Sequence, residues 1–492
     1  MIRSFRSATL LAAVVLLSAC GTANVNYVTG ETQRGAYSWQ QEVQIGTEAD
    51  QQISAQFGLY DDARVTAYVD RVANDVLQTS AYTDPNTPAE IRNTPFHFRV
   101  LDSPVVNAFA LPGGYVYVTR GLLSYLENEA QLAVVLGHEI GHVLARHSSE
   151  QAARVQTGQL GLLLGAAVGG VVGGGRVAQG ILDYGSQGVG LLFLKYGRGA
   201  EREADQAGVA YAEYAGYDAA QASRFFVALS RLSSGSGQSI PGFLSTHPDP
   251  GEREATIRQL ATQYPGGTEV NAPDFLAAID GIVLGEDPRQ GYVENNIFYH
   301  PELQFAFDIP RGWQVDNSPQ AVVMRQPNNQ AAIQMTLSQQ SSAQAAAQAF
   351  AAQQGVQVSD SRRLNANGNT AYRVEGRAAQ QSGTLAFSVT FIEYGGNVYQ
   401  MLGITPDAAF SSQVSTLRDV ASSFRRLTEA RYLNRSPSRL DVTTTSGTTT
   451  LQALLQGRTL PEGLTAEELA IMNQTQLGAS IPAGTTVKLP GR

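Results

Sequence analysis

The sequence HEIGH at positions 138–142 constrains this chain more than any other stretch. On an α-helix, the imidazoles of His138 and His142 lie about 40° apart around the axis and roughly 6 Å apart along it, so both can reach one metal ion. Glu139 lies on the neighbouring face, where its carboxylate can reach a water at that metal without becoming a ligand. The motif therefore predicts a zinc hydrolase site, and the alternative is a chance match on an ordinary helix.

The segment around the motif, residues 127–151, is predicted to form one long helix. Asn128 is a suitable N-cap residue, and Gln131 follows it at the spacing of a capping box. The apolar run AVVLG directly before the motif predicts that this helix is buried.

A zinc site of this kind needs a third protein ligand and leaves a fourth position for water. The best candidate is Glu201 in GRGAEREADQAG, on a second predicted helix. Asp205, one turn further on, would accept a hydrogen bond from a ligand imidazole and fix its tautomer. Glu203 lies about 200° around the helix from Glu201 and is predicted to face solvent. A Glu and an Asp at this spacing are common on solvated helix faces, but the intact motif upstream favours the ligand interpretation.

Four stretches, taken in order, resemble the HtpX/CAAX-protease-type gluzincin metallopeptidase family, and in particular its BepA-like periplasmic lipoprotein branch. They are NAFALPGGYVYVTRGLL at 107–123, LGHEIGHVLARHS at 136–148, EREAD at 201–205 and STHPDPGER at 245–253. The resemblance covers roughly residues 45–265. It implies one Zn²⁺ per chain, with Glu139 as catalytic base and three ligands, His138, His142 and Glu201. The family often has Ser-Arg before the third ligand, where this chain has Gly197-Arg198, a change that removes no ligand.

Residues 107–118 show the alternation of strands, interrupted by a turn at Pro112-Gly113-Gly114. In zinc proteases, an edge strand near the metal pairs with an extended peptide substrate. An ordinary core hairpin is the alternative, which the aromatic residues alone favour. The resemblance places four residues along the substrate cleft: Asn107, Ala108, Phe109 and Ala110.

His247 precedes Pro248 in a loop sequence, followed by a predicted helix at 251–263. The resemblance implies that His247 can lie over the zinc and that Arg253 contacts the substrate or the transition state. We hypothesise that His247 is a removable fourth ligand, which excludes the catalytic water and keeps the enzyme inactive. In the competing hypothesis, His247 is a donor to the transition state. A turn with a helix cap is compatible with both.

The other histidines are predicted to be outside the metal site. On one continuous helix, His147 would lie about 140° around the axis from His142, so it could support or pack against the site but not join it. His97 lies inside a strand-like run, and His300 has no metal partner nearby in the sequence.

The first 19 residues are predicted to be a lipoprotein signal peptide. A basic start is followed by apolar residues 8–17, which are too few to span a membrane, and then by LSAC, which ends at Cys20, the only cysteine. Cleavage before Cys20 and lipidation of its thiol would anchor the protein in a membrane. Gly21 at the next position favours the outer membrane, with the protein facing the periplasm. With no second cysteine, no intramolecular disulfide is expected.

Residues 155–175 are uncharged, glycine-rich and nearly long enough to span a membrane. They lie between the HEIGH helix and Glu201, so a span would need a return to the same side, which only residues 188–194 could supply. A mobile, amphipathic cover or a membrane-skimming loop is therefore favoured over membrane insertion.

Composition excludes one class of partner. The formal net charge is −9, and there is no basic stripe or nucleic-acid motif, so nucleic acid is not expected to bind. A length of 492 residues with 43% hydrophobic content predicts several packed domains.

The predicted fold class is α+β, beginning with a mainly helical zincin protease domain. The predicted segments are a signal peptide at 1–19, a tether at 20–45, the zinc metalloprotease domain at 46–265, a linker at 266–290, a PsbP-like α+β domain at 291–428, and a linker with a small LysM-like module at 429–492. The PsbP-like domain contains a predicted hairpin around Gly395-Gly396 and no catalytic constellation. A LysM-like module would imply contact with peptidoglycan, and a plain helical cap is the alternative.

These features predict a zinc-dependent metalloendopeptidase of the bacterial cell envelope. Its expected substrates are unfolded or misassembled envelope proteins, in quality control or assembly. Two alternatives from other classes are a non-proteolytic chaperone or assembly factor and a peptidoglycan-associated scaffold. Cleavage of an unfolded protein that a chelator abolishes would separate the enzyme from both.

Overall fold

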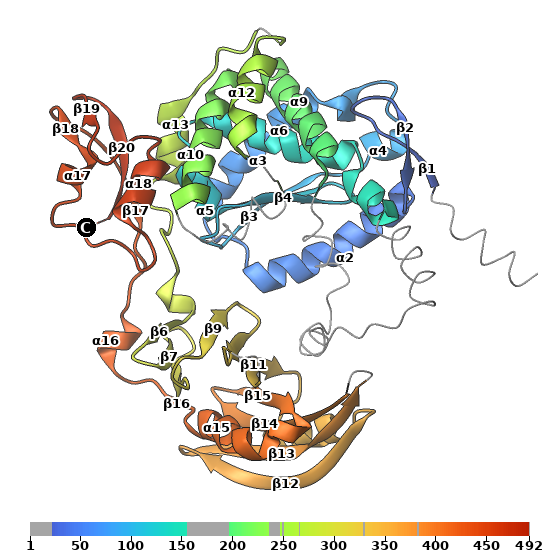
Figure 1. Ribbon diagram of the computed structural model, residues 1–492, viewed down its shortest axis with the longest axis vertical. Coiled ribbons are helices and arrows are strands. Elements are labelled where there is room, and N and C mark those ends of the chain that lie inside the picture. The colour runs from blue at the N-terminus through green and yellow to red at the C-terminus, as the bar shows by residue number, and fades with distance from the viewer. Residues whose placement is uncertain are drawn as a thin grey trace, which may run out of the picture. The chain divides into compact units, whose positions relative to one another are not determined.

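The computed structural model describes residues 22–154, 196–235, 247, 250–264, 266–327, 330–380 and 383–491. Cys20 and the apolar runs at 155–175 and 188–194 lie outside these residues. The described residues divide into two compact units, one containing the residues before Glu286 together with those from Ser438 onward, and the other containing Glu286–Pro437 (Figure 1). Both units mix helices and strands, which confirms the predicted α+β class. None of the described helices is both long and apolar enough to cross a bilayer.

The first unit is built around a three-stranded sheet with the order β3-β5-β4. The strands are β3 (His97–Leu101), β5 (Tyr115–Thr119) and β4 (Ala108–Leu111), and β4 is an edge strand. The main helices are α2 (Trp39–Phe57), α3 (Ala63–Gln78), α6 (Glu129–Leu144), α9 (Arg198–Tyr214), α10 (Ala222–Gly235) and α12 (Pro250–Ala261). Alternate strand residues pack against the main core that includes α6, or against Ala49 and Ile53 of α2 on the opposite face (Figure 1).

Helix α6, which carries the HEIGH motif, is buried along its whole length. The Asn128 side chain caps it by accepting a hydrogen bond from the backbone N–H of Gln131 at 2.9 Å, as predicted. Two glycines let α9 approach closely: a Cβ at Gly141 would lie 2.9 Å from the Cβ of Ala207, and one at Gly137 would lie 3.0 Å from the carbonyl oxygen of Gly208. This close packing brings Glu201 on α9 to the two histidines of α6.

The prediction of one helix through residue 151 is wrong, because α6 ends at Leu144. Arg146 has a positive φ of 59°, and a separate helical segment follows at 147–154. The Arg146 guanidinium bonds the buried carboxylate of Glu42 on α2, and the backbone N–H of Tyr27 bonds the Leu144 carbonyl at 3.1 Å. Contacts with the N-terminal segment therefore replace the next turn of helix.

Residues 266–285 are not the linker that composition suggested. They contain helix α13 (Ala272–Ile279), and Phe275 and Ile282 are buried in the core of the first unit. The apolar sequence FLAAIDGIVL explains why this stretch packs: it carries enough hydrophobic surface to join the core.

The C-terminal residues form a small module within the first unit. Its elements are β17 (Leu440–Thr444), β18 (Thr449–Thr450), α17 (Leu451–Leu454), α18 (Ala466–Met472), β19 (Ser480–Ile481) and β20 (Thr486–Pro490). Leu440, Leu469 and Leu489 are buried in the same core as α6, so the module is part of the protease core. The sequence predicted a small module here but not this shared core.

The second unit contains a seven-stranded and a four-stranded sheet. The larger sheet has the order β12 (Val356–Ala366), β13 (Asn369–Gln380), β14 (Gly383–Tyr394), β15 (Asn397–Pro406), β11 (Ala332–Ser338), β10 (Val322–Arg325), β9 (Gln314–Asn317). The smaller has the order β16 (Arg425–Arg426), β8 (Phe305–Asp308), β7 (Ile297–His300), β6 (Tyr292–Glu294). The second unit also contains the helices α14 (Ala343–Ala351) and α15 (Phe410–Ser422). The predicted hairpin is also confirmed: Gly395 and Gly396, at φ 59° and 81°, connect β14 to β15.

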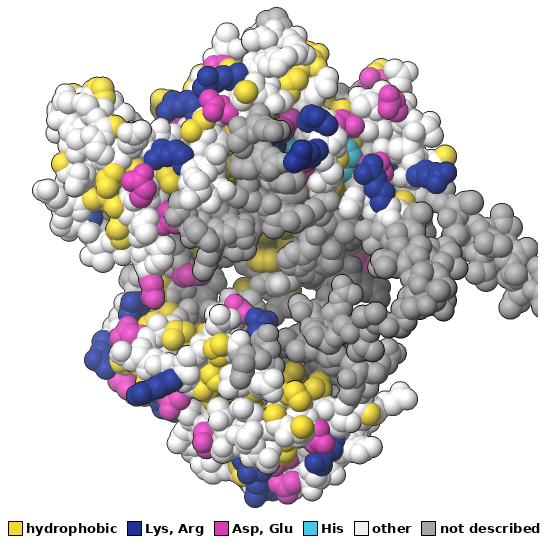
Figure 2. Space-filling view, in the orientation of Figure 1, with side chains coloured by type: hydrophobic (Ala, Val, Ile, Leu, Met, Phe, Trp, Pro, Cys, Tyr) yellow, Lys and Arg dark blue, Asp and Glu magenta, His cyan; other side chains and the backbone are white. Residues whose placement is uncertain are grey.

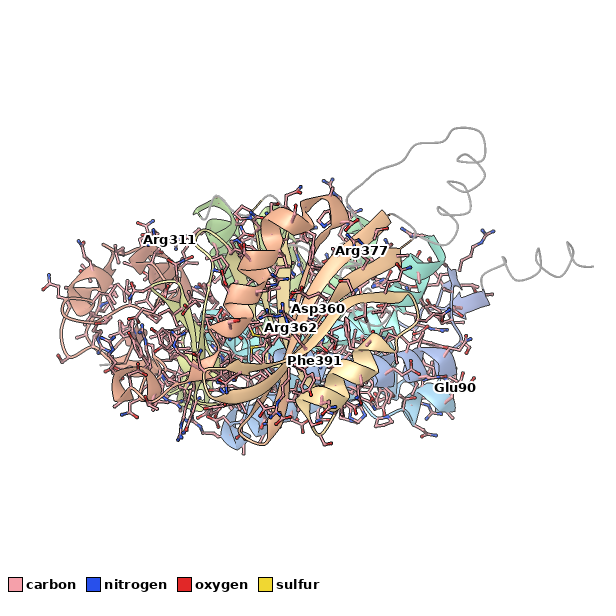
Figure 3. All side chains as sticks on the ribbon, turned by 90° about the horizontal axis from the view of Figure 1, so that it is seen from below. Glu90, Arg311, Asp360, Arg362, Arg377 and Phe391 are labelled. Atoms are coloured by element: carbon pink, nitrogen blue, oxygen red, sulfur yellow. The ribbon has the colours of Figure 1, made fainter. Side chains whose placement is uncertain are left out.

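Charges protect the long outer strand β12. Arg362 and Asp360 lie together on it (Figure 3), with the Arg362 Nε 3.1 Å from the Asp360 carboxylate, and a bulge interrupts the strand after Val358. Charges and bulges of this kind disfavour pairing with another chain. On the face seen in Figure 2, positive and negative side chains of the described residues are interspersed.

Candidate metal centre

Four buried side chains converge at the junction of α6 and α9: His138, His142, Glu201 and His247. One ligand atom from each lies within 4.8 Å of all the others. The His138 and His142 Nε2 atoms are 3.0 Å apart, and they lie 3.7 and 3.6 Å from the Glu201 carboxylate oxygens. With metal–nitrogen bonds of about 2.0–2.1 Å, ligands of a tetrahedral zinc ion lie about 3.3 Å apart. The donor atoms therefore fit a single zinc-sized cation in both type and spacing.

Asp205 holds the first histidine, as the sequence predicted. Its carboxylate lies 3.0 Å from His138 Nδ1, and it accepts a hydrogen bond from Arg253 Nε at 3.0 Å. Burial opposes ionisation of Asp205, but Arg253 and His138 outweigh it and lower its pKa to about 2. An ionised Asp205 would keep the Nδ1 proton on His138 and leave Nε2 free to bind a metal.

One face of His142 is covered by the ring of Tyr196. Tyr196 stacks on it at a centroid distance of 4.1 Å, and its hydroxyl lies 2.9 Å from Ser148 Oγ. Burial and the neighbouring imidazoles hold the pKa of His142 well below its usual value. A neutral imidazole is the form that binds a metal.

Glu139 is fully buried beside the donor atoms. Among the described residues, neither of its carboxylate oxygens has a hydrogen-bond partner, and one of them lies 3.5 Å from His247 Nε2. Burial raises the pKa of Glu139, which brings a carboxylate closer to the range where it can accept and return a proton near neutral pH.

His247 lies inside the cluster. Its Nδ1 is 3.0 Å from one Glu201 carboxylate oxygen and 3.3 Å from His138 Nε2. Burial opposes protonation of His247, but Glu201 and Glu139 outweigh it and raise its pKa. The Nδ1 position matches that of a fourth ligand, whereas Nε2 faces Glu139.

Arg253 is buried on the other side of Glu201. Its Nη1 lies 3.6 Å from a Glu201 carboxylate oxygen, and its guanidinium lies over the Phe226 ring, 4.3 Å from the centroid. Asp205 and Phe226 thus fix a cation at the edge of the donor cluster.

Strand β4 runs beside the cluster. It pairs with β5 on one side, and in the described part of the chain no strand pairs with its other side. Ala108 and Ala110 belong to the α6 side of the sheet, and Ala110 lines a narrow hollow together with His142. Phe109 points the other way, where it stacks on Tyr117, so it is a core residue. The side-chain oxygen of Asn107 is buried without a hydrogen-bond partner among the described residues.

Two polar residues differ from their predicted surroundings. Glu203 does not face solvent, because it bonds Asn26 and lies 3.6 Å from His147 Nε2. The His147 Nδ1 lies 2.8 Å from the His142 Nδ1. His147 reaches this position because α6 ends at Leu144, whereas on one continuous helix it would lie on another face. Tyr196 was not predicted, and its only signal was its position directly before the helix of Glu201.

The two distant histidines, His97 and His300, lie outside the donor cluster, as predicted. His97 stacks on Tyr115 at 4.7 Å. His300, in the second unit, accepts a hydrogen bond from the backbone N–H of Leu303 at 3.2 Å.

Comparisons with known proteins agree with this geometry. Residues 64–261 match Peptidase family M48. The chain is 29% identical to the Beta-barrel assembly-enhancing protease of Yersinia pestis over 51% of this chain and 50% of that protein. It is 30% identical to the Mitochondrial metalloendopeptidase OMA1 of Schizosaccharomyces pombe over 39% of this chain and 52% of that protein. The chain thus spans about half the length of these relatives.

A solved structure of cyanobacterial PsbP from Synechocystis sp. PCC 6803 also shows a weak similarity to this chain. The similarity has a TM-score of 0.23 and 18% identity, over 26% of this chain and 91% of that one, too weak for any functional conclusion. The sequence motifs, the buried donor cluster and the family match all lie in the first unit. The match to peptidase family M48 thus covers residues 64–261, in the unit that contains the donor cluster.

Proposed function

We propose that the chain is a zinc-dependent metalloendopeptidase of the bacterial cell envelope. One observation carries the proposal: a buried His-His-Glu-His group has its ligand atoms within 4.8 Å of one another. A second carboxylate, Glu139, lies beside that group without a hydrogen-bond partner among the described residues. A metal site with an adjacent buried base is the arrangement of a hydrolase.

His138, His142 and Glu201 would hold Zn²⁺, which when bound supplies the Lewis acidity that acidifies a water molecule and polarises the scissile carbonyl. Glu139 takes a proton from that water and returns it to the leaving amine. Arg253, whose guanidinium Asp205 orients, is the proposed cation that contacts the substrate or the transition state. Its buried position favours a strong interaction with developing negative charge.

The substrate is proposed to bind as an extended peptide along β4. The outer side of this strand pairs with no other described strand, so its backbone can add a substrate strand. Asn107, Ala108 and Ala110 would contact that peptide, and the side-chain oxygen of Asn107 could accept a hydrogen bond from a substrate amide. Phe109 would act indirectly, by packing under the strand.

His247 is proposed to be a removable fourth ligand. Its Nδ1 lies 3.3 Å from His138 Nε2 and 3.0 Å from Glu201, which supports a resting state that leaves no position for the catalytic water. A substrate or partner that binds the state without this contact would shift the population toward activity. His247→Ala should then raise basal cleavage of an unfolded protein while zinc stays bound. Reduced cleavage would instead make His247 a transition-state donor.

The proposed cellular role is based on the name of the bacterial relatives, Beta-barrel assembly-enhancing protease. We propose that the substrates are unfolded or misassembled envelope proteins, and that a lipid on Cys20 anchors the protein to the outer membrane, facing the periplasm. A PsbP-like second unit and a LysM-like C-terminal module, with a contact to peptidoglycan, belong to the same proposal.

The test is cleavage by the full chain of casein or an unfolded outer-membrane protein, with and without a chelator. Loss of cleavage with the chelator, and its return when zinc is added, is the expected result. Substrate binding without cleavage under every condition would favour a chaperone or assembly factor. Binding to isolated sacculi tests the peptidoglycan contact separately.

A further inference from the structure

The two histidines of α6 are held in different ways. His138 Nδ1 faces a carboxylate, that of Asp205, at 3.0 Å. His142 Nδ1 instead faces another imidazole, with His147 Nδ1 at 2.8 Å. His147 can reach this position because the backbone turns at Arg146, with φ 59°, before the next helical segment.

The contacts continue from His147 to a second carboxylate. His147 Nε2 lies 3.6 Å from a Glu203 carboxylate oxygen, with side-chain exposures of 2% for His147 and 23% for Glu203. The same oxygen accepts a hydrogen bond from the side-chain amide of Asn26. Burial opposes ionisation of Glu203, but His147 and Asn26 outweigh it and lower its pKa.

The row of contacting side chains His142, His147 and Glu203 allows one arrangement of protons when His142 binds a metal through Nε2. The His142 Nδ1 must then carry a proton, and it donates to His147 Nδ1, which must be unprotonated. The remaining proton of a neutral His147 lies on Nε2, which faces Glu203. Each group thus fixes the tautomer of the next.

We propose that His147 and Glu203 are positioning residues for the metal ligand His142, and that Asn26 links them to the N-terminal hairpin. The proposal rests on the metal site of the proposed function. It assigns His142 an indirect carboxylate support, through an imidazole, in place of the direct one that His138 receives from Asp205.

The N-terminal hairpin secures this row at several points. The hairpin is formed by β1 (Thr22–Val25) and β2 (Thr32–Gly35). The Tyr27 N–H bonds the Leu144 carbonyl at 3.1 Å, and the Asn24 side-chain amide bonds Ser149 Oγ at 3.3 Å. These bonds hold the chain on both sides of His147, at Leu144 and at Ser149. The N-terminal hairpin, which lies inside the predicted tether at 20–45, therefore contributes to the metal site.

The test compares two substitutions at His147 in the full chain. His147→Phe keeps a ring but removes the acceptor, whereas His147→Asn retains an acceptor near the Nδ1 position. Loss of groups that orient a ligand costs about 10- to 100-fold in metal affinity. We expect His147→Phe to weaken zinc binding by about that factor, His147→Asn to restore most of it, and Glu203→Gln to weaken it by about 10-fold. The readout is zinc affinity by competition with a chromophoric chelator.

The matched control is Glu150→Gln. Glu150 is 24% exposed, lies in the same helical segment as His147, and pairs with Arg154 instead of the metal site. Its zinc affinity should stay within twofold of wild type. If His147→Phe does not fold, His147→Asn and Glu203→Gln still carry the test, because a Glu203→Gln affinity equal to that of the control would overturn the proposal.

A second readout needs no metal. In the metal-free chain with ¹⁵N-labelled histidine, the fraction of His142 that carries its proton on Nδ1 should be lower in His147→Phe than in wild type, because the substitution removes the acceptor that faces Nδ1. Unchanged affinity and tautomer in His147→Phe would overturn the proposal, as would a His147→Asn variant no better than His147→Phe. A wild type that binds no zinc would refute the proposed function, whereas the tautomer comparison would still test the positioning role.

Discussion

Lys488 offers a sharp test of whether the C-terminal module stabilises the protease unit. Its side chain is 1% exposed, and it is one of two lysines in the chain. The ammonium donates to the carbonyls of Ser124 at 2.9 Å and Leu126 at 2.7 Å, and lies 3.0 Å from a Glu127 carboxylate oxygen. These three residues directly precede α6, so Lys488 fixes the start of the helix that carries the metal ligands.

The expected cost of Lys488→Met follows from those contacts. A buried acceptor left without a donor costs about 1–3 kcal/mol, and two carbonyls lose their donor. Breaking a buried ion pair costs about 3–5 kcal/mol, but Glu127 is 20% exposed and can be hydrated, which reduces this cost. Burial lowers the pKa of Lys488, so removing it also relieves a desolvation penalty. We expect a net loss of about 3 kcal/mol in the free energy of unfolding of the first unit.

The assay is urea unfolding of the full chain followed by tryptophan fluorescence. The chain has two tryptophans: Trp39 is buried in the first unit and Trp313 is partly buried in the second, so fluorescence in a Trp313→Phe background reports the first unit alone. Arg439→Met is the control, because Arg439 is exposed and, among the described residues, its side chain makes one hydrogen bond, to the Gly281 carbonyl at 2.7 Å. A loss below about 1 kcal/mol for Lys488→Met, equal to that of the control, would refute the reasoning.

Three further predictions concern other parts of the chain. Glu201→Ala should lower zinc occupancy, measured by elemental analysis, and full occupancy would move the third ligand elsewhere, with His247 the first suspect. Burial lowers the pKa of His300 to about 4, so the second unit binds fewer protons than its unfolded chain between about pH 4 and 6.5. Its stability should be complete above pH 6.5 and fall by about 3 kcal/mol on acidification toward pH 4, a loss read from Trp313 fluorescence that His300→Asn should remove. Cys20→Ala should release the protein from the membrane fraction, and retention after a carbonate wash would make residues 155–175 the anchor.

The sequence correctly predicted those features that depend on neighbouring residues or on a specific motif. The cap of α6 at Asn128, the hairpin at Gly395-Gly396 and the approach of Glu201 to HEIGH all depend on residues close in sequence or on a specific motif. The alternation around Ala108 and Ala110 was also enough to predict a strand, although not that Phe109 faces the core.

Long-range contacts produced the differences. Helix α6 ends at Leu144 because the Tyr27 N–H bonds the Leu144 carbonyl and the Glu42 carboxylate bonds Arg146, and no sequence signal near Arg146 indicates these distant partners. Glu203 was placed in solvent because helix periodicity cannot show that Asn26, 177 residues away, lies against it. Lys488 bonds Ser124 across 364 residues, which is why the C-terminal module was not assigned to the protease core.

The most direct test of the metal-dependent mechanism is a paired measurement on Glu139→Gln, with zinc content by elemental analysis and cleavage of an unfolded outer-membrane protein on the same preparation. Glu139 is proposed as the proton carrier and not as a ligand, so the variant should retain about one zinc per chain and lose cleavage by a factor of about 100 or more. Cleavage near the wild-type rate would contradict the assigned role of Glu139, and loss of the zinc would contradict its exclusion from the ligands.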